Sequence, residues 1–169
     1  MRVVIVGCGR VGAALAEAFA GLGHSVTIID TSTRAFDRLS DSFPGQAVRG
    51  DGTDEDVLRR AGAEDADVFV ALTEGDNRNI MATQVAMENL GAKRAIAKIN
   101  DPVRAAAYAE LGVATICRTT MLTDALLGFV GVKPTGMPSV IAPVPHVHEG
   151  GAPKLGASPI GGAGLATEG

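Results

Sequence analysis

Residues 3–12 read Val-Val-Ile-Val-Gly-Cys-Gly-Arg-Val-Gly, and this stretch decides the fold class. Its first four residues are an uninterrupted run of β-branched aliphatic residues, typical of a strand buried on both faces of a parallel sheet. Glycines at 7, 9 and 12 follow, and apolar residues then recur at helical spacing. These apolar residues are Val11, Ala14, Leu15, Ala18, Phe19 and Leu22. The stretch predicts a strand, a glycine-rich turn and a helix.

The chain continues this alternation as far as residue 133. Strands are expected over residues 3–6, 25–29, 46–48, 68–72, 95–98 and 113–116. The helices that follow the first one are expected over residues 33–41, 54–61, 77–90, 102–111 and 121–130, with Thr53 as the cap of the second of these. Six strands alternating with helices indicate an α/β fold, a Rossmann-type doubly wound parallel sheet of six strands.

The composition changes after residue 133. Of the 36 residues in 134–169, 14 are Gly or Pro, a fraction typical of unstructured chain. Residues 140–144 form a short extended segment at most, because their interleaved prolines argue against a central strand. We expect one domain over 1–133 and an unstructured Gly/Pro-rich tail over 134–169.

Charge and cysteine content exclude several classes of protein. The net charge of −4 and pI of about 5.3 argue against a nucleic-acid binder that depends on basic charge. Cys8 and Cys117 are the only cysteines, so a disulfide scaffold or a zinc module is not expected. The apolar runs are too short to span a membrane, and the first residues do not resemble a signal peptide. A cytoplasmic protein is expected.

The glycines at 7, 9 and 12 match a nucleotide-binding fingerprint when read with Asp30, which ends the next strand. Gly7 permits the turn, Gly9 lets the backbone approach a pyrophosphate, and Gly12 lets the helix pack on the strand. The helix N-terminus then faces the phosphates, and Asp30 accepts hydrogen bonds from ribose hydroxyls. The alternative is a tight turn that binds nothing.

Asp30 also bears on the choice of nucleotide. Its carboxylate would repel a 2′-phosphate, Thr31 and Ser32 offer no adjacent cation, and Arg34 lies one turn further on. NAD(H) or an adenosine nucleotide is therefore favoured over NADP(H).

Further candidate ligand-binding residues are identified by their positions near the carboxyl ends of the predicted strands. Arg10 opposes the helix dipole, which favours a phosphate contact, including one to a nucleotide in a neighbouring subunit, over a solvated or intrachain-paired arginine. Asp51, followed by Gly52, either accepts from the adenine amino group or makes a turn. Thr73 and Glu74 follow the fourth strand, which places Thr73 near the distal phosphate or second ribose. Lys98 reaches the same crevice or lies at its edge.

A set of acid and base residues for catalysis is not evident. His24 lies at the wrong edge, and the two tail histidines, His146 and His148, lack a third metal ligand. Tyr108 has no Lys four residues after it, and Cys8 has no general base beside it. No catalytic or metal-ligating residue is therefore assigned.

The chain resembles the TrkA-N domain, also called RCK domain, of Trk/Ktr potassium-uptake regulators. The resemblance runs over residues 1–130. The residues that carry it are 4–12, 29–30, 50–54, Leu58, Ala61, Gly62, 66–67, 71–73, Asp76, Asn77, Asn79, 97–102 and 110–113.

The resemblance implies a regulatory subunit that binds NAD(H) or ATP/ADP and gates a membrane-embedded K⁺ transporter subunit from the inner face of the cell membrane. The implied pocket residues are Gly7, Cys8, Gly9, Arg10, Val11, Gly12, Asp30, Asp51, Gly52, Thr73, Glu74 and Lys98. It also implies a homodimer or a larger ring, with the helix from Met121 packing on a partner. The Gly/Pro tail stands where many such regulators begin a second ligand-binding domain, so either a second regulatory subunit supplies that part or the nucleotide domain works alone.

Two other functions remain open from the sequence. The first is an NAD-dependent oxidoreductase of unknown substrate, and the second is a Rossmann-type domain that serves only as an interaction module. NADH turnover would distinguish the enzyme, and a substitution at Asp30 or Gly9 would distinguish the module, which should keep its partner-dependent function.

Overall fold

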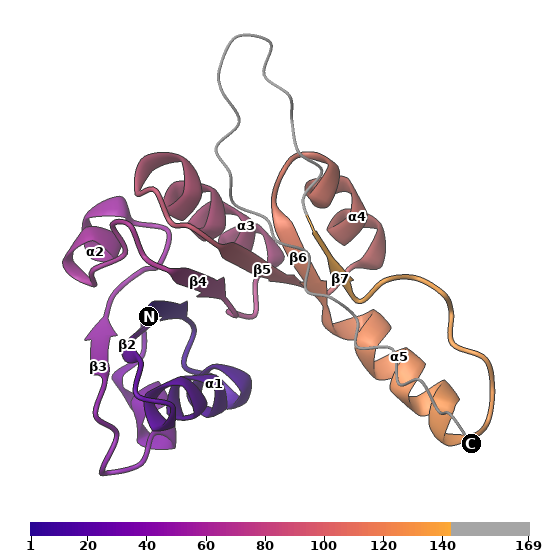
Figure 1. The fold of residues 1–169 in the computed structure, drawn as a ribbon, viewed down its shortest axis with the longest axis horizontal. Helices are drawn as coiled ribbons and strands as arrows, with labels where there is room; N and C mark the ends of the chain where they lie inside the picture. Colours follow the sequence, from indigo (N-terminus) through magenta and orange to yellow (C-terminus); the bar gives the residue numbers. More distant parts are fainter. Residues whose placement is uncertain (143–169) are drawn as a thin grey trace, which may run out of the picture.

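The computed structural model describes residues 1–142, in which strands and helices alternate along the chain (Figure 1). The strands are β1 (Arg2–Val6), β2 (Ser25–Asp30), β3 (Gln46–Arg49), β4 (Val68–Ala71), β5 (Ala95–Ile99), β6 (Ala114–Cys117) and β7 (Val140–Ile141). The α-helices are α1 (Arg10–Gly21), α2 (Glu55–Arg60), α3 (Asp76–Gln84), α4 (Pro102–Glu110) and α5 (Arg118–Phe129). A 3₁₀-helix, η1 (Thr33–Arg38), and a π-helical turn, η2 (Val85–Asn89), complete the order.

The strands form one sheet in the order β3-β2-β1-β4-β5-β6-β7. The first six strands are parallel, as the buried aliphatic runs predict, and β1 pairs with both β2 and β4. Strands β2 and β3 therefore extend the sheet on one side of β1, and the chain then crosses back so that β4, β5 and β6 extend it on the other side. This reversal leaves a crevice at the carboxyl ends of β1 and β4, where open α/β sheets bind their ligands.

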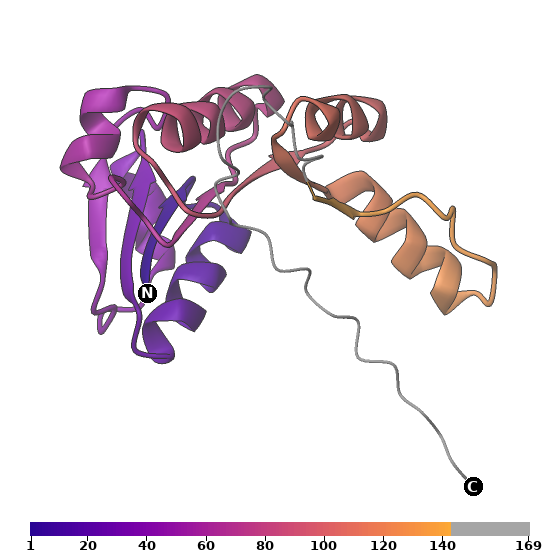
Figure 2. The same ribbon diagram turned by 45° about the horizontal axis from the view of Figure 1, so that its top comes forward.

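Helices cover the sheet in two layers (Figures 1 and 2). The helices α2, α3 and α4 lie on one face, and α1 lies with η1 on the other. Each layer buries its own apolar cluster: Phe69 and Leu58 belong to the first, and Ile5 and Ile28 to the second. Because both faces are covered, residues 3–6 of β1 and 69–71 of β4 are buried, which explains why these runs are continuously apolar.

The packing of α1 differs from the expected apolar stripe. Its buried residues are Gly12, Ala13 and Ala16, whereas Val11 is 63% and Leu22 is 73% exposed. Ala14 and Ala18 are also exposed, while Leu15 and Phe19 are partly buried. Small residues face the sheet because they let the helix axis approach the strand closely, and of the larger expected residues only Leu15 and Phe19 pack against the inner cluster.

Several predicted element boundaries are wrong. The segment expected as a helix over 33–41 is a 3₁₀-helix of six residues, with i to i+3 hydrogen bonds such as Ala35 N to Ser32 O. The cap of α2 is Asp54, whose Oδ1 accepts from the amides of Asp56 and Val57, and not Thr53. The last helix begins at Arg118, three residues before Met121.

The sheet has a seventh strand beyond the six expected. β7 pairs antiparallel with β6 at the edge, and it lies in the run at 140–144 for which only a short extended segment was expected. Residues 143–169 of the predicted tail, with both of its histidines, lie outside the described residues. No helix within residues 1–142 is long and apolar enough to cross a membrane.

The last helix extends away from the end of the sheet (Figures 1 and 2). Thr120 is its only buried residue, and all of its large apolar side chains except half-buried Leu127 are exposed. These side chains are Met121, Leu122, Leu126 and Phe129, the last of them 89% exposed.

Candidate functional site

A cavity of about 440 Å³ opens at the carboxyl ends of β1 to β4, at the predicted crevice. Eight of the twelve sequence-predicted pocket residues line it. They are Gly7, Cys8, Gly9, Asp30, Asp51, Gly52, Thr73 and Glu74. The volume is in the usual range for small-molecule and cofactor sites.

The glycine loop has the form that its sequence predicts. Gly7 has a φ of 103°, and a Cβ there would lie 3.0 Å from the backbone of Leu72 and Thr73. A Cβ on Gly12 would lie 1.9 Å from the Gly7 carbonyl oxygen, so glycine is needed for the helix to pack against the loop. Gly9 lines the cavity and has open space where a Cβ would stand, which leaves room for a ligand.

Asp30 holds the loop in place. Its Oδ2 accepts a hydrogen bond of 2.8 Å from the Cys8 amide, and its Oδ1 accepts one of 2.9 Å from the Ser32 amide. Each oxygen keeps a lone pair for another donor, such as a ribose hydroxyl. The carboxylate therefore links the turns after β1 and β2 before any ligand binds.

Cys8 is buried at the base of the loop. Its Sγ lies 3.3 Å from the Ala35 carbonyl oxygen, and its amide is taken by Asp30. Burial, followed by the negative charge of Asp30, raises the pKa of the Cys8 thiol. The thiol therefore packs in the loop and is not activated as a nucleophile.

Asp51 makes the turn that was one of its two expected roles. Its Oδ1 accepts from the Thr53 amide at 3.0 Å and the Thr53 hydroxyl at 2.9 Å, and these bonds lower the pKa of the Asp51 carboxyl. Asp51 lines the cavity, and its Oδ2 has no hydrogen-bond partner within residues 1–142. The turn therefore leaves one carboxylate oxygen for a donor such as an amino group.

Thr73 is fixed by Asn79, a residue that the sequence singles out only through the family resemblance. The fully buried Asn79 accepts from the Thr73 amide at 2.8 Å and from its hydroxyl at 2.7 Å. Its Nδ2 donates to the carbonyl oxygens of Thr73 at 3.0 Å and Lys98 at 2.8 Å. One amide side chain thus joins the ends of β4 and β5, and the Thr73 hydroxyl oxygen can still accept a bond from a ligand.

Four predicted site residues lie outside the cavity lining. Arg10 and Val11 are exposed at the start of α1, and Gly12 packs beneath the loop. Lys98, the last residue but one of β5, is half-buried; burial, then the charge of Arg118, lowers the pKa of its ammonium group. No ion pair involves Arg10 within residues 1–142, so the intrachain pairing considered for it is not seen there.

Three arginines that the sequence did not assign to the site also line the cavity. Arg34 and Arg38 come from η1, beside Asp30, and Arg78 comes from the first turn of α3. Within residues 1–142, none of them forms an ion pair with the acidic residues of the lining. A basic residue in the first turn of a helix, where the dipole disfavours it, is the sequence signal that could have identified Arg78.

This arrangement suits a phosphorylated, hydroxyl-rich ligand. The start of α1 offers unpaired amides and the positive end of a dipole to a phosphate, carboxylates offer acceptors to hydroxyl and amino groups, and arginines offer positive charge. Within residues 1–142, no group of three His, Cys, Asp or Glu side chains could hold a metal ion.

Relatives of the chain are potassium-uptake proteins. The Trk system potassium uptake protein TrkA of Streptomyces coelicolor is 46% identical over 127 residues, which cover 75% of this chain and 57% of the relative. The TrkA homologue of Pyrococcus abyssi is 33% identical over 111 residues, covering 66% of this chain and 49% of the relative. The chain thus spans about half the length of these two relatives.

Solved structures share the fold. The TrkA-N domain of the Escherichia coli inner membrane protein ybaL superposes with a TM-score of 0.68 at 21% identity, covering 76% of this chain and 96% of that one. The Shewanella denitrificans Kef CTD, in its AMP-bound form, gives 0.62 at 24% identity, covering 79% and 84%. The GsuK channel bound to NAD gives 0.61 at 18% identity, covering 75% of this chain and 23% of that one.

The family model for the TrkA-N domain matches residues 3–119. That range contains the glycine loop, Asp30, Asp51, Thr73 and the Asn79 link between strands. The sequence match, the strand order and the preformed cavity agree, and the chain belongs to the TrkA-N domain family.

Proposed function

We propose that this chain is a non-catalytic, nucleotide-responsive regulatory subunit of a Trk/Ktr-type potassium uptake system. It would act at the inner face of the cell membrane on a membrane-embedded K⁺-translocating subunit. The observation that carries the proposal is the cavity at the carboxyl ends of β1 to β4, in a chain of the TrkA-N family. The names of the relatives support the link to potassium uptake.

The proposed ligand is NAD(H) or an adenosine nucleotide, ATP or ADP. The glycine loop would hold its phosphates, Asp30 its ribose, and Asp51 with Gly52 the adenine side. Thr73 and Glu74 would lie beside the distal phosphate or second ribose. Fold relatives captured with NAD, AMP and ADP support an adenine-containing ligand.

The proposed residues outside the cavity need a second copy of the chain or a longer ligand. Arg10 stands exposed at the positive end of α1, and in a homodimer or ring it would contact a nucleotide bound to the neighbouring copy. Lys98 would meet the distal part of a dinucleotide. The exposed apolar side chains of α5 would pack on the partner copy. Any second regulatory chain would join the same assembly.

The proposed mechanism is a shift in population. A nucleotide that binds one arrangement of the paired domains more tightly than the other stabilises that arrangement by its differential affinity, and the transporter subunit senses the outcome. Two nucleotides with different contacts across the domain pair would then have opposite effects on transport.

The test is equilibrium dialysis and thermal unfolding with ATP, ADP, NAD⁺ and NADH. A ligand at 100 times its dissociation constant should add about 2.7 kcal/mol to the free energy of unfolding. Gly9→Asp is the matched variant: its side chain enters open space, so the fold is kept while a carboxylate occupies the phosphate position. If none of the four ligands binds the wild-type chain at millimolar concentration, the proposal is wrong.

A further inference from the structure

Arg78 is a cation in the cavity lining that the fold itself does not use. It stands in the first turn of α3, where the helix dipole disfavours a positive charge. Within residues 1–142 its guanidinium makes no hydrogen bond and no ion pair, although Asp51 and Glu74 also line the cavity. A charge placed against the dipole and left without a protein partner is available to a ligand.

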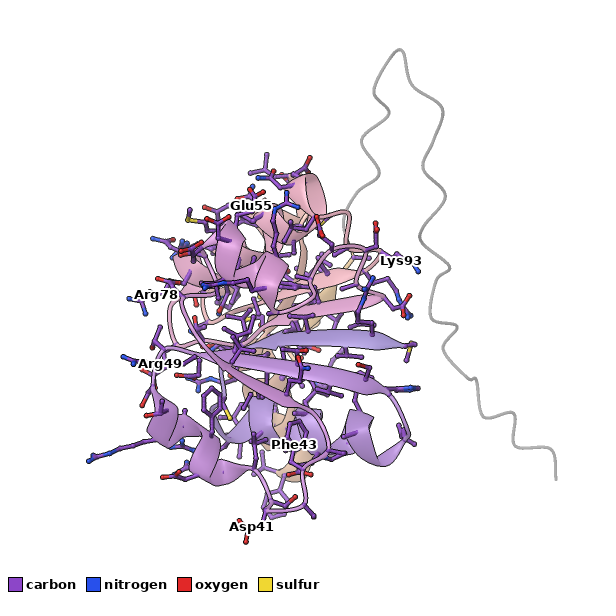
Figure 3. The ribbon with its side chains drawn as sticks, turned by 90° about the vertical axis from the view of Figure 1, so that its left-hand side faces the viewer. Asp41, Phe43, Arg49, Glu55, Arg78 and Lys93 are labelled. Carbon is purple, nitrogen blue, oxygen red and sulfur yellow. The ribbon has the colours of Figure 1, made fainter. Side chains whose placement is uncertain are left out.

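The position of Arg78 points to one part of the cavity. Its Cγ and Cδ atoms lie 3.6 Å from where a Cβ of Gly75 would stand, so the stem lies back along the cap of α3. Its charge acts on the carboxyl of Asp51, whose pKa it helps to lower. Figure 3 shows Arg78 on the same edge of the molecule as Arg49, the last residue of β3, and away from Lys93.

This part of the cavity is separate from the position proposed for the phosphates. The loop amides and the start of α1 lie on one face of the sheet, whereas α3 lies on the other. The turn at Asp51 and Gly52 lies on the α3 side, because a Cβ on Gly52 would meet the side chain of Val6, which packs in the same apolar cluster as α3. The free Oδ2 of Asp51, proposed to accept from an adenine amino group, is thus on the same side as Arg78.

We propose that Arg78 determines base specificity by laying its guanidinium on the adenine ring while Asp51 accepts from the ring's amino group. The inference rests on the proposed nucleotide function and assigns a residue of the same cavity. A guanidinium is planar, delocalised and weakly hydrated, and it stacks on aromatic rings in a way that an ammonium cannot. A purine offers it a larger face than a pyrimidine.

The experiment compares ADP with UDP, which carry the same phosphates on different bases. Dissociation constants are measured by calorimetry for the wild-type chain, Arg78→Gln, Arg78→Lys and the control Arg60→Gln, an exposed arginine of α2 outside the cavity. Both Arg78 variants should weaken ADP binding about fivefold and UDP binding less than twofold, and Arg60→Gln should change neither. Thermal unfolding without nucleotide should be the same for all four proteins, because both arginines are exposed.

The outcomes separate the inference from the function on which it rests. If Arg78→Gln weakens ADP and UDP equally, or if Arg78→Lys binds ADP as the wild type does, Arg78 acts through charge on a phosphate and the inference is overturned. Unchanged ADP binding in both variants overturns it as well. If the wild-type chain binds no ADP, NAD⁺ or ATP, the proposed function fails first and the inference falls with it.

Discussion

The Oδ2 atom of Asp30, at the end of β2, accepts a hydrogen bond of 2.8 Å from the backbone amide of Cys8 in the loop after β1. The same carboxylate accepts from Ser32 through its other oxygen. A residue singled out for a ligand's ribose is therefore also a structural link between two turns. Substitutions at this position should change both the stability of the chain and its affinity for nucleotides.

Asp30→Ala should lower the free energy of unfolding by about 2 kcal/mol, because it leaves two amides without their charged acceptor. Nucleotide affinity should fall at least tenfold, since the ribose acceptor and the loop geometry are both lost. Urea unfolding and equilibrium dialysis measure the two effects. Asp30→Asn keeps one acceptor oxygen, so its stability and its nucleotide affinity should lie between those of the wild type and Asp30→Ala. An Asp30→Ala protein with wild-type stability would contradict the assigned role.

Gly12 and Gly9 should respond differently to the same added methyl group. Gly12→Ala places a Cβ 1.9 Å from the Gly7 carbonyl oxygen, so α1 must move and the free energy of unfolding should fall by about 2 kcal/mol or more. Gly9→Ala adds its methyl group to open space and should leave stability within about 0.5 kcal/mol of the wild type. Thermal unfolding of the pair tests this; equal losses would argue against the loop packing described here.

Asn79→Leu should be among the most destabilising single substitutions in the chain. It is close to isosteric but removes the Asn79 hydrogen bonds of four polar atoms, the Thr73 amide, hydroxyl and carbonyl and the Lys98 carbonyl. Each unpaired buried group costs about 1–3 kcal/mol, so a loss of about 3 kcal/mol or more is expected. Urea unfolding measures it, with Asn77→Leu on the exposed side of the same helix turn as the control, where a loss below about 1 kcal/mol is expected.

Asp67 should make the free energy of unfolding depend on pH in the acid range. Its carboxylate accepts from Lys93 and from the Arg2 amide, and these bonds lower the pKa of Asp67 to about 2. Because the folded pKa is depressed, the contribution to stability is present above the unfolded pKa near 4 and is lost as pH falls towards 2. The stability difference between the wild type and Asp67→Asn should be constant above pH 5 and shrink from pH 4 to 2. A difference that does not change with pH would contradict this.

Much of the site could be predicted because its chemistry is local in sequence. The strand, the three glycines and Asp30 occur at spacings that one supersecondary unit dictates, and the cavity forms where the β1–β4 reversal predicts it. The expected turn at Asp51 is present for the same reason, since an aspartate bonds its own backbone two residues on.

The rest depends on contacts that spacing does not encode. Periodicity suggested Val11 and Leu22 for the inner face of α1, but the close approach of helix and strand selects Gly12, Ala13 and Ala16. The Thr53 hydroxyl is already used by Asp51, so Asp54 becomes the cap. Arg78 reaches the cavity from a helix far along the chain, and strand β7 forms by pairing with the edge of β6.

The bond between Asp30 and Cys8 has a consequence for how fast and how selectively the site can respond. The conformational entropy of the loop is already lost when the chain folds, so a nucleotide meets a receptor that needs little local ordering. Association should then approach the rate of ordinary diffusional encounter, with little heat capacity change from local refolding. Bound and free states would relax quickly after a change in nucleotide concentration, and any slow step in regulation would belong to movements between whole domains.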